Sequence, residues 1–148
     1  MSKKKELEDA LKASLKANDT VRKNTLRLVL TSIKEAEVRE QTELDDAAIV
    51  SILQKEVKSR QETQDEAKGA GRDDLAEAAQ AEIEVLESYL PQQMDDAELE
   101  GIIDAAIAET GASAVSDMGN VMKAVLPKVG GRADGGRVSQ IVRQKLQG

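Results

Sequence analysis

The chain has 148 residues, of which 40% are hydrophobic, and a formal net charge of −7. It holds no cysteine, histidine, phenylalanine or tryptophan, and it has one tyrosine. These absences exclude disulfides, thiolate metal sites and histidine catalysis, and one aromatic ring is too few for a surface on which bases stack. The length suits one domain, or two small ones, with aliphatic cores.

The first two predicted helices lie before residue 41. Leucines at steps of four predict a first helix that stops near Asn18, with the inward residues Leu7, Leu11 and Leu15. A second helix spans about residues 20–40 and begins at a cap formed by Asp19 or Thr20. Its inward residues are Val21, Leu28, Val29, Ile33 and Ala36. On the opposite side a basic stripe, interpreted as a solvated face or as a second binding site, consists of Lys23, Arg27 and Lys34.

Two further helices complete the N-terminal part. The third begins near Asp45, is wholly polar over residues 58–68, and packs through Ile49, Ile52, Leu53 and Val57. Its polar end is expected either to project into solvent or to be covered by a partner. The fourth begins at Asp73 or Asp74 and ends at residues 89–91, before a proline. Its inward residues are Leu75, Ala79, Ile83, Leu86 and Leu90.

A domain boundary is expected at residues 91–95, between an N-terminal helical domain (1–91) and a C-terminal domain (92–148). Asp95 and Glu98 resemble a capping box ahead of a fifth helix, whose stripe is Leu99, Ile102, Ile103 and Ile107. The sixth helix, in which Pro127 marks a kink or a break, follows residues 110–111 and carries Met118, Met122, Val125 and Val129. The seventh starts at a cap formed by Asp134 and carries Val138, Ile141 and Val142. The predicted fold is therefore all-α, with two small helical bundles of about four and three helices.

Charge is distributed in blocks. Residues 1–72 carry 15 basic and 14 acidic side chains, residues 73–116 carry 12 acids and no base, and residues 117–148 carry six bases and two acids. The acidic block would repel nucleic acid, so any such contact is expected at the two ends of the chain. The lysines at 3–5 are followed at once by acids, unlike a signal peptide, and no apolar run suits a membrane span. These features predict a cytoplasmic protein without membrane contact.

Three pairs of neighbouring carboxylates, at residues 45–46, 73–74 and 95–96, raise the question of a magnesium site. Each pair stands at a predicted helix start, where capping and the helix dipole explain it better. The glycine-rich stretch at residues 130–136 lacks the Gly-Lys-Ser/Thr ending of a nucleoside-triphosphate loop. No metal, cofactor or catalytic residue is therefore expected.

The residues after 117 also carry a family resemblance. It rests on Met118-Gly119-Asn120-Val121-Met122, Pro127-Lys128, Gly130-Gly131-Arg132-Ala133-Asp134-Gly135 and Val138-Ser139-Gln140-Ile141-Val142. Further matches upstream are Thr25-Leu26-Arg27, Arg72-x-Asp74-Leu75-Ala76 and Tyr89-Leu90-Pro91-Gln92-Gln93. Together they resemble the YqeY family, which is similar at its C-terminal end to the tail domain of the GatB subunit of tRNA-dependent amidotransferases. Asn120 departs from the family pattern, in which lysine is common.

The resemblance implies a connection with tRNA and with carbon–nitrogen ligase activity that uses glutamine as amido-N-donor. Such chemistry needs a nucleophile that hydrolyses glutamine and an ATP site, and the chain has a motif for neither. The chain alone is therefore not expected to be an enzyme. Its expected partners are tRNA or a tRNA-charging enzyme.

Candidate RNA contacts follow residue 117. They are Lys123, Lys128, Arg132, Gly135, Gly136, Arg137, Gln140, Arg143 and Gln144. Four of them, from Arg137 to Gln144, share one face of the seventh helix and suit sugar and phosphate contacts. The glycine turn has two interpretations. Either the N–H groups of Gly135 and Gly136 cradle a phosphate, or Asp134 occupies those donors and the arginines are solvated.

The favoured function is a non-catalytic, tRNA-associated accessory module whose basic ends recognise the shape and backbone of a folded RNA. The alternative from another class is a protein–protein adaptor. It would present to its partner either the acidic block at residues 73–116 or the polar end of the third helix.

Overall fold

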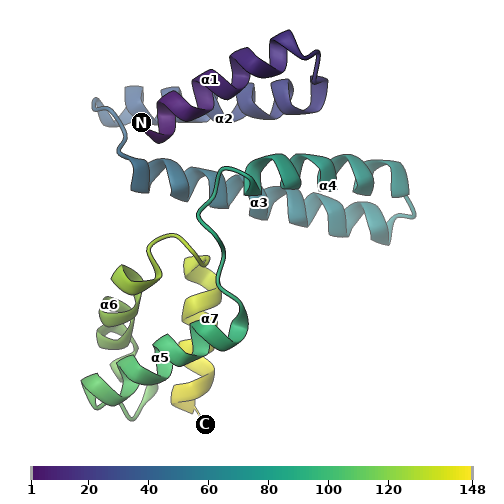
Figure 1. Cartoon of the computed structure of the whole chain (residues 1–148). Coiled ribbons are helices and arrows are strands. Elements are labelled where there is room, and N and C mark those ends of the chain that lie inside the picture. Colours follow the sequence, from purple (N-terminus) through teal and green to yellow (C-terminus); the bar gives the residue numbers. More distant parts are fainter. Residues whose placement is uncertain (1, 148) are drawn as a thin grey trace. The chain divides into compact units, whose positions relative to one another are not determined.

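The computed structural model describes residues 2–147, and within this range the chain forms seven α-helices, one short 3₁₀ helix and no strand. The all-α prediction is confirmed. The helices fall into two compact units, which divide between Leu90 and Pro91 (Figure 1). None of the described helices combines the length and the apolar composition that crossing a bilayer requires.

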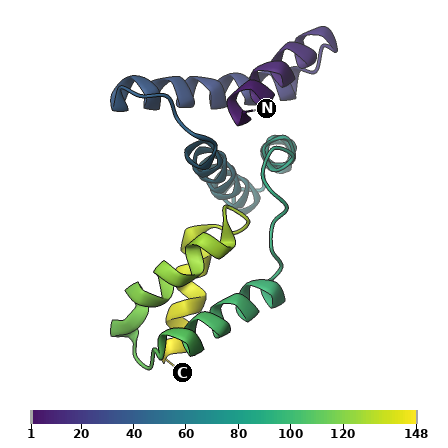
Figure 2. The same ribbon diagram turned by 60° about the vertical axis from the view of Figure 1, so that its left-hand side comes forward.

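The N-terminal unit consists of two helical hairpins (Figures 1 and 2). The first is formed by α1 (Lys3–Lys16) and α2 (Thr20–Glu40), and the second by α3 (Asp46–Gly69) and α4 (Asp73–Glu87). All four contribute to one aliphatic core of Leu7, Leu26, Val29, Ile33, Ile49, Leu53, Val57, Ile83 and Leu86. The predicted helices and their order are confirmed.

Four residues predicted to face inward are instead exposed: Leu15, Val21, Leu28 and Leu75. On α2, the buried side is occupied by Leu26 and Thr25 together with Val29 and Ile33. Leu28 is one residue before Val29 and therefore points about 100° away from it, so one helix cannot bury both against the same partners. The prediction was wrong there because it assigned too wide a face of the helix to the core.

The polar end of α3 packs on one side against α4 of the same chain, while most of its side chains face solvent, as one of the two expectations had it. Alanines at the contact, Ala67, Ala76 and Ala79, are buried and allow a close approach of the two helices. Arg60 of α3 forms an ion pair with Glu82 of α4 at 3.3 Å and a second one with Glu56 of its own helix at 2.5 Å. The sequence pattern missed this contact because alanine is too small to create a strong apolar stripe.

The C-terminal unit is a bundle of α5 (Asp96–Thr110), α6 (Met118–Val129) and α7 (Gly135–Gln147), with a 3₁₀ turn, η1 (Val115–Asp117), ahead of α6. Its core is formed by Met94, Leu99, Ile103, Ala106, Val121, Val125, Val129, Ala133, Val138, Val142 and Leu146. Pro127 lies in the last turn of α6, which ends two residues later. Met118 and Met122 are half-buried at the edge of this core.

Aspartates cap three of the helices. The side chains of Asp19, Asp45 and Asp95 accept hydrogen bonds from backbone N–H groups three residues later, at 3.1, 2.8 and 2.8 Å. Capping therefore explains two of the three carboxylate pairs. The third is different, because Asp74 binds the guanidinium of Arg72 at 3.0 and 3.1 Å and α4 has no side-chain cap.

Candidate functional site

Two arginines predicted to contact RNA, Arg132 and Arg137, bind the segment that leads into α5. Arg132 donates from Nε to the carbonyl of Gln92 at 2.8 Å and from Nη2 to Glu98 at 3.2 Å. Arg137 donates to the carbonyl of Met94 at 3.1 Å and forms an ion pair with Asp96. Both side chains are half-buried. Their guanidinium groups are engaged by carbonyls and carboxylates of the same unit.

Two lysines of the same unit are also paired with α5. Lys128 lies 3.4 Å from Glu109, and Lys145 lies 3.0 Å from Asp104. The hydrogen bond to Asp104 raises the pKa of Lys145 above its ordinary value of 10.5. From residue 91 onward the chain carries eight acidic and six basic side chains. The local positive charge that follows residue 117 is therefore largely neutralised by α5.

The glycine turn places a carboxylate at the start of α7. Gly130 and Gly131 take left-handed backbone conformations, with φ of +56° and +84°, which favour glycine. A Cβ added to Gly136 would lie 3.2 Å from Oδ2 of Asp134, so this carboxylate sits against the first turn of α7. A phosphate at Gly135 and Gly136 would meet that negative charge, and the plain-turn interpretation is the better one for these two residues.

Seven of the nine candidate residues are exposed. Four of the seven lie outside the glycine turn and form no ion pair with α5: Lys123, Gln140, Arg143 and Gln144. Within residues 2–147, neither Lys123 nor Arg143 forms an ion pair or a side-chain hydrogen bond. The stripe on α2 is likewise unpaired there. Arg27 and Lys34 are exposed and Lys23 is half-buried. The exposed face of α7 and the α2 stripe therefore keep unpaired positive charge.

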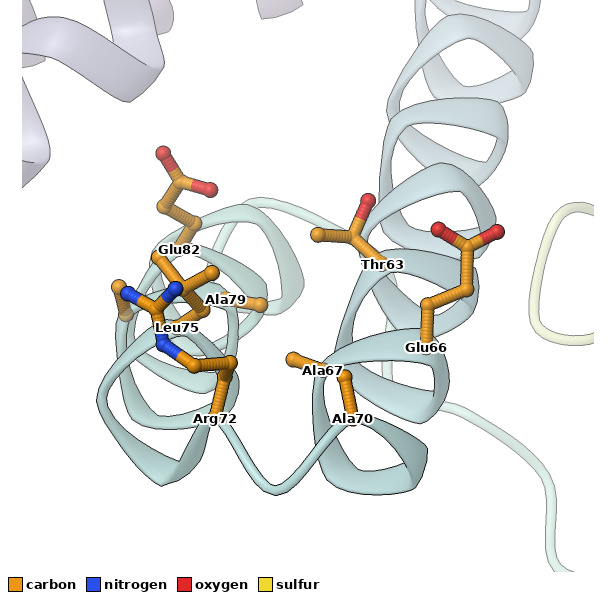
Figure 3. A pocket seen from close by; sticks show the side chains of 9 residues that line it. Thr63, Glu66, Ala67, Ala70, Arg72, Leu75, Ala79 and Glu82 are labelled. Carbon is orange, nitrogen blue, oxygen red and sulfur yellow. The ribbon is translucent and has the colours of Figure 1, made fainter.

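A groove of about 370 Å³ lies between the end of α3 and the start of α4 (Figure 3). Its floor is apolar and includes Ala67, Ala70 and Ala79, together with Leu75, which is 47% exposed. Glu66 and Glu82 lie among the polar residues that line it. The sequence pattern does not indicate this groove, because it places Leu75 in the core. No catalytic side chain converges on it.

Acidic side chains do not converge elsewhere either. In the part of the chain that the structure describes, no group of three or more carboxylates is arranged to hold a metal ion. Tyr89, which lies at the end of the N-terminal unit, is held by its neighbours: Arg22 donates to its hydroxyl at 2.5 Å, and Lys3 donates to its carbonyl at 2.7 Å. These contacts fasten α1 and α2 to the residues after α4.

Comparison with known proteins gives one family and several relatives. The family described as "Yqey-like protein" matches residues 4–146. A protein of Pyrenophora tritici-repentis named "Altered inheritance of mitochondria protein 41, mitochondrial" is 28% identical over 95% of this chain and 77% of its own length. Proteins with the same name from Lachancea thermotolerans and Meyerozyma guilliermondii are 34% and 36% identical, over 69% and 54% of this chain.

In the latter two relatives the match spans only 54% and 42% of their own length. The expectation of a cytoplasmic protein is contradicted by these relatives, whose names place them in mitochondria. The expectation rested on the acids that follow the lysines at 3–5 and on the absence of a long apolar run. Neither feature distinguishes the cytosol from other compartments.

Proposed function

This chain belongs to the Yqey-like protein family, and from that premise we propose that it is a non-catalytic, tRNA-associated accessory module. It contacts the backbone of a folded RNA through the exposed face of α7. The proposal rests on the exposure of Arg143 and on its lack of an ion-pair partner among the described residues. This cation is exposed and unpaired, whereas Arg137 and Lys145 on the same helix are held by carboxylates of α5.

The neighbours of Arg143 support contact with sugar and phosphate. Gln140 and Gln144 lie three residues before it and one residue after it, and both are exposed on the side of α7 away from buried Val138 and Val142. A guanidinium pairs with phosphate, and glutamine amides can donate to or accept from ribose hydroxyls. Base stacking is not available to the C-terminal unit. The chain has one tyrosine, Tyr89, which lies in the N-terminal unit and is held there by Arg22 and Lys3.

The link to carbon–nitrogen ligation remains an implication of the family resemblance. In this proposal a tRNA-dependent amidotransferase supplies the glutamine-hydrolysing nucleophile and the ATP site, and this chain supplies contact with the tRNA. With Arg143 and Lys123 as the unpaired cations of the C-terminal unit, binding is weak and tolerant of sequence. The slope of log affinity against log salt concentration then corresponds to about one or two neutralised phosphates.

The test compares two double variants by fluorescence anisotropy with tRNA over a range of salt. Arg143→Gln with Lys123→Gln should weaken binding and reduce the salt slope by about one for each phosphate that the variant no longer neutralises. The matched control, Lys145→Gln with Lys128→Gln, removes the same charge from paired positions and should change the slope much less. Unchanged affinity and slope in the first variant would rule out the C-terminal face as the RNA site.

A protein–protein adaptor is the second candidate, and the groove of Figure 3 favours it. Leu75 and the alanines offer an apolar floor, and the carboxylates of Glu66 and Glu82 would attract a basic partner. Part of the acidic block at 73–116 does not contribute to such a surface, because four of the α5 carboxylates, those of Asp96, Glu98, Asp104 and Glu109, are paired internally. Co-migration with tRNA that falls steeply with salt would favour the RNA module over the adaptor.

A further inference from the structure

Two helices of the N-terminal unit carry charged stripes with the same spacing. On α2 the basic stripe consists of Lys23, Arg27 and Lys34, at steps of four and seven residues. On α4 an acidic stripe consists of Asp73, Glu77 and Glu84, also at steps of four and seven. Both steps are close to whole helical turns, so each set lies on one face of its helix.

Neither stripe is paired within the chain. Among residues 2–147 no ion pair involves any of the six side chains, whereas other basic residues of the N-terminal unit, such as Lys4 and Arg60, are paired. The two helices meet through their buried sides, where Leu26 and Ile33 of α2 share one core with Ile83 and Leu86 of α4. The stripes lie away from these core residues and stay exposed, apart from half-buried Lys23.

We propose that the two stripes are the halves of a contact between two copies of this chain. In this contact α4 of one copy lies parallel to α2 of the other. The register then opposes Lys23 to Asp73, Arg27 to Glu77 and Lys34 to Glu84. Only the parallel orientation matches all three pairs, because an antiparallel one would set a step of four against a step of seven. The three pairs span eleven residue steps along each helix, which corresponds to a rise of about 16 Å.

An aliphatic side chain on α2 adds to this surface. Val38, one turn beyond Lys34 and on the same face, is 70% exposed. Each exposed ion pair contributes at most about 1 kcal/mol, so the association is weak and depends on salt. Val38 favours a protein surface over RNA as the occupant, since an apolar side chain does not contribute to phosphate contacts. The acidic stripe would itself repel RNA.

Charge reversal tests the proposal on the full chain. One variant carries Lys23→Glu, Arg27→Glu and Lys34→Glu, and the other carries Asp73→Lys, Glu77→Lys and Glu84→Lys. Sedimentation velocity at several protein concentrations should show self-association of the unchanged chain that weakens at least roughly tenfold between about 0.01 M and about 1 M salt, where the Debye length falls from about 30 Å to about 3 Å. Each variant alone should be monomeric, because both of its stripes then have the same sign.

Mixing the two variants restores opposite charges in both contacts, so an equimolar mixture should associate although neither variant does alone. Circular dichroism of each variant checks that the helices are intact. A monomeric unchanged chain at low salt, self-association of either variant, or a mixture that stays monomeric would each overturn the proposal. If the α2 variant loses tRNA binding while its sedimentation matches that of the unchanged chain, the basic stripe belongs to RNA and the proposal fails.

The parallel register can be tested by disulfide cross-linking, because the chain contains no cysteine that would compete with the introduced ones. Copies with Arg27→Cys mixed with copies with Glu77→Cys should form an intermolecular disulfide. Arg27→Cys mixed with Glu87→Cys is the control, since residue 87 lies about 15 Å further along α4. Equal cross-linking in the two mixtures would contradict the register.

Discussion

Arg132 and Glu98 form a bidentate ion pair, in which each guanidinium Nη atom lies 3.2 Å from a different carboxylate oxygen. The pair joins the turn between α6 and α7 to the first turn of α5. Two backbone contacts reinforce it, because Arg132 also donates to the carbonyl of Gln92 and its own carbonyl accepts from Met94 at 2.8 Å. This arginine therefore holds the C-terminal bundle closed at one end.

Arg132→Gln should destabilise the C-terminal unit, while Arg143→Gln should not. The first change removes an ion pair and a hydrogen bond from a half-buried guanidinium, and we expect the free energy of unfolding to fall by roughly 1 kcal/mol. The second removes an exposed, unpaired charge. Denaturant unfolding monitored by circular dichroism measures both. Equal stability of the two variants would mean that the Arg132 contacts contribute nothing.

Asp95→Ala should lower the free energy of unfolding by about 0.5–2 kcal/mol, because it removes the acceptor for the N–H of Glu98 at the start of α5. Asp95→Asn is the matched control, since its side-chain oxygen can still accept that hydrogen bond. Thermal melts of the two variants separate the cap from the charge. A loss of the same size in both would assign the effect to charge instead.

Glu37 should make stability depend on pH in the acidic range. The hydrogen bond from Lys4 and, second to it, the one from the backbone N–H of Leu44 hold the pKa of Glu37 below its ordinary value of 4.5. A carboxyl with a lowered folded-state pKa stabilises the protein above its unfolded pKa and loses that contribution as pH falls through the folded value. Thermal melts from neutral to acid pH should therefore decline less steeply in Glu37→Gln than in the unchanged chain.

The same pair predicts the opposite behaviour in alkali. Its hydrogen bond to Glu37 raises the pKa of Lys4 above 10.5, so this contribution is present below pH 10.5 and is lost as pH rises through the raised folded-state pKa. In Lys4→Met the alkaline decline in melting temperature should be smaller than in the unchanged chain. An identical alkaline decline would show that the Lys4–Glu37 contact does not form in solution.

Thr25→Val should leave stability unchanged or raise it. Thr25 is fully buried in α2, and its hydroxyl has no hydrogen-bond partner among the described residues. Valine has nearly the same shape and removes an unsatisfied polar atom, which can be neutral or stabilising. A drop in melting temperature would show that the hydroxyl has a partner in solution, such as a bound water.

A fragment from Gln92 to Gly148 should fold independently. Every buried residue of its core lies between Met94 and Leu146. The fragment should be helical and melt cooperatively, although a domain this small is only marginally stable. Circular dichroism with thermal melting measures this. A disordered fragment would contradict the predicted division of the chain into domains.

Local rules predicted the helices well. The bounds of α2, its cap at Asp19 and the cap at Asp95 depend on residues within one turn of each other. Hydrogen bonds and steric limits at that range follow directly from which residues are neighbours in the sequence. The buried stripes of α5 and α7 were also predicted, since each helix has one strongly aliphatic face.

The tertiary structure decided which charges are free. Along the chain, the acids of α5 and the bases after residue 117 form separate blocks, and that separation suggested a basic RNA surface. In the fold, Arg132 reaches Glu98 and Arg137 reaches Asp96, across 34 and 41 residues of sequence. Ion pairing depends on separation in space within a few ångströms. The sequence alone therefore determined the helices and the total charge, and packing of α5 against α6 and α7 determined that Arg143 and Lys123 stay unpaired.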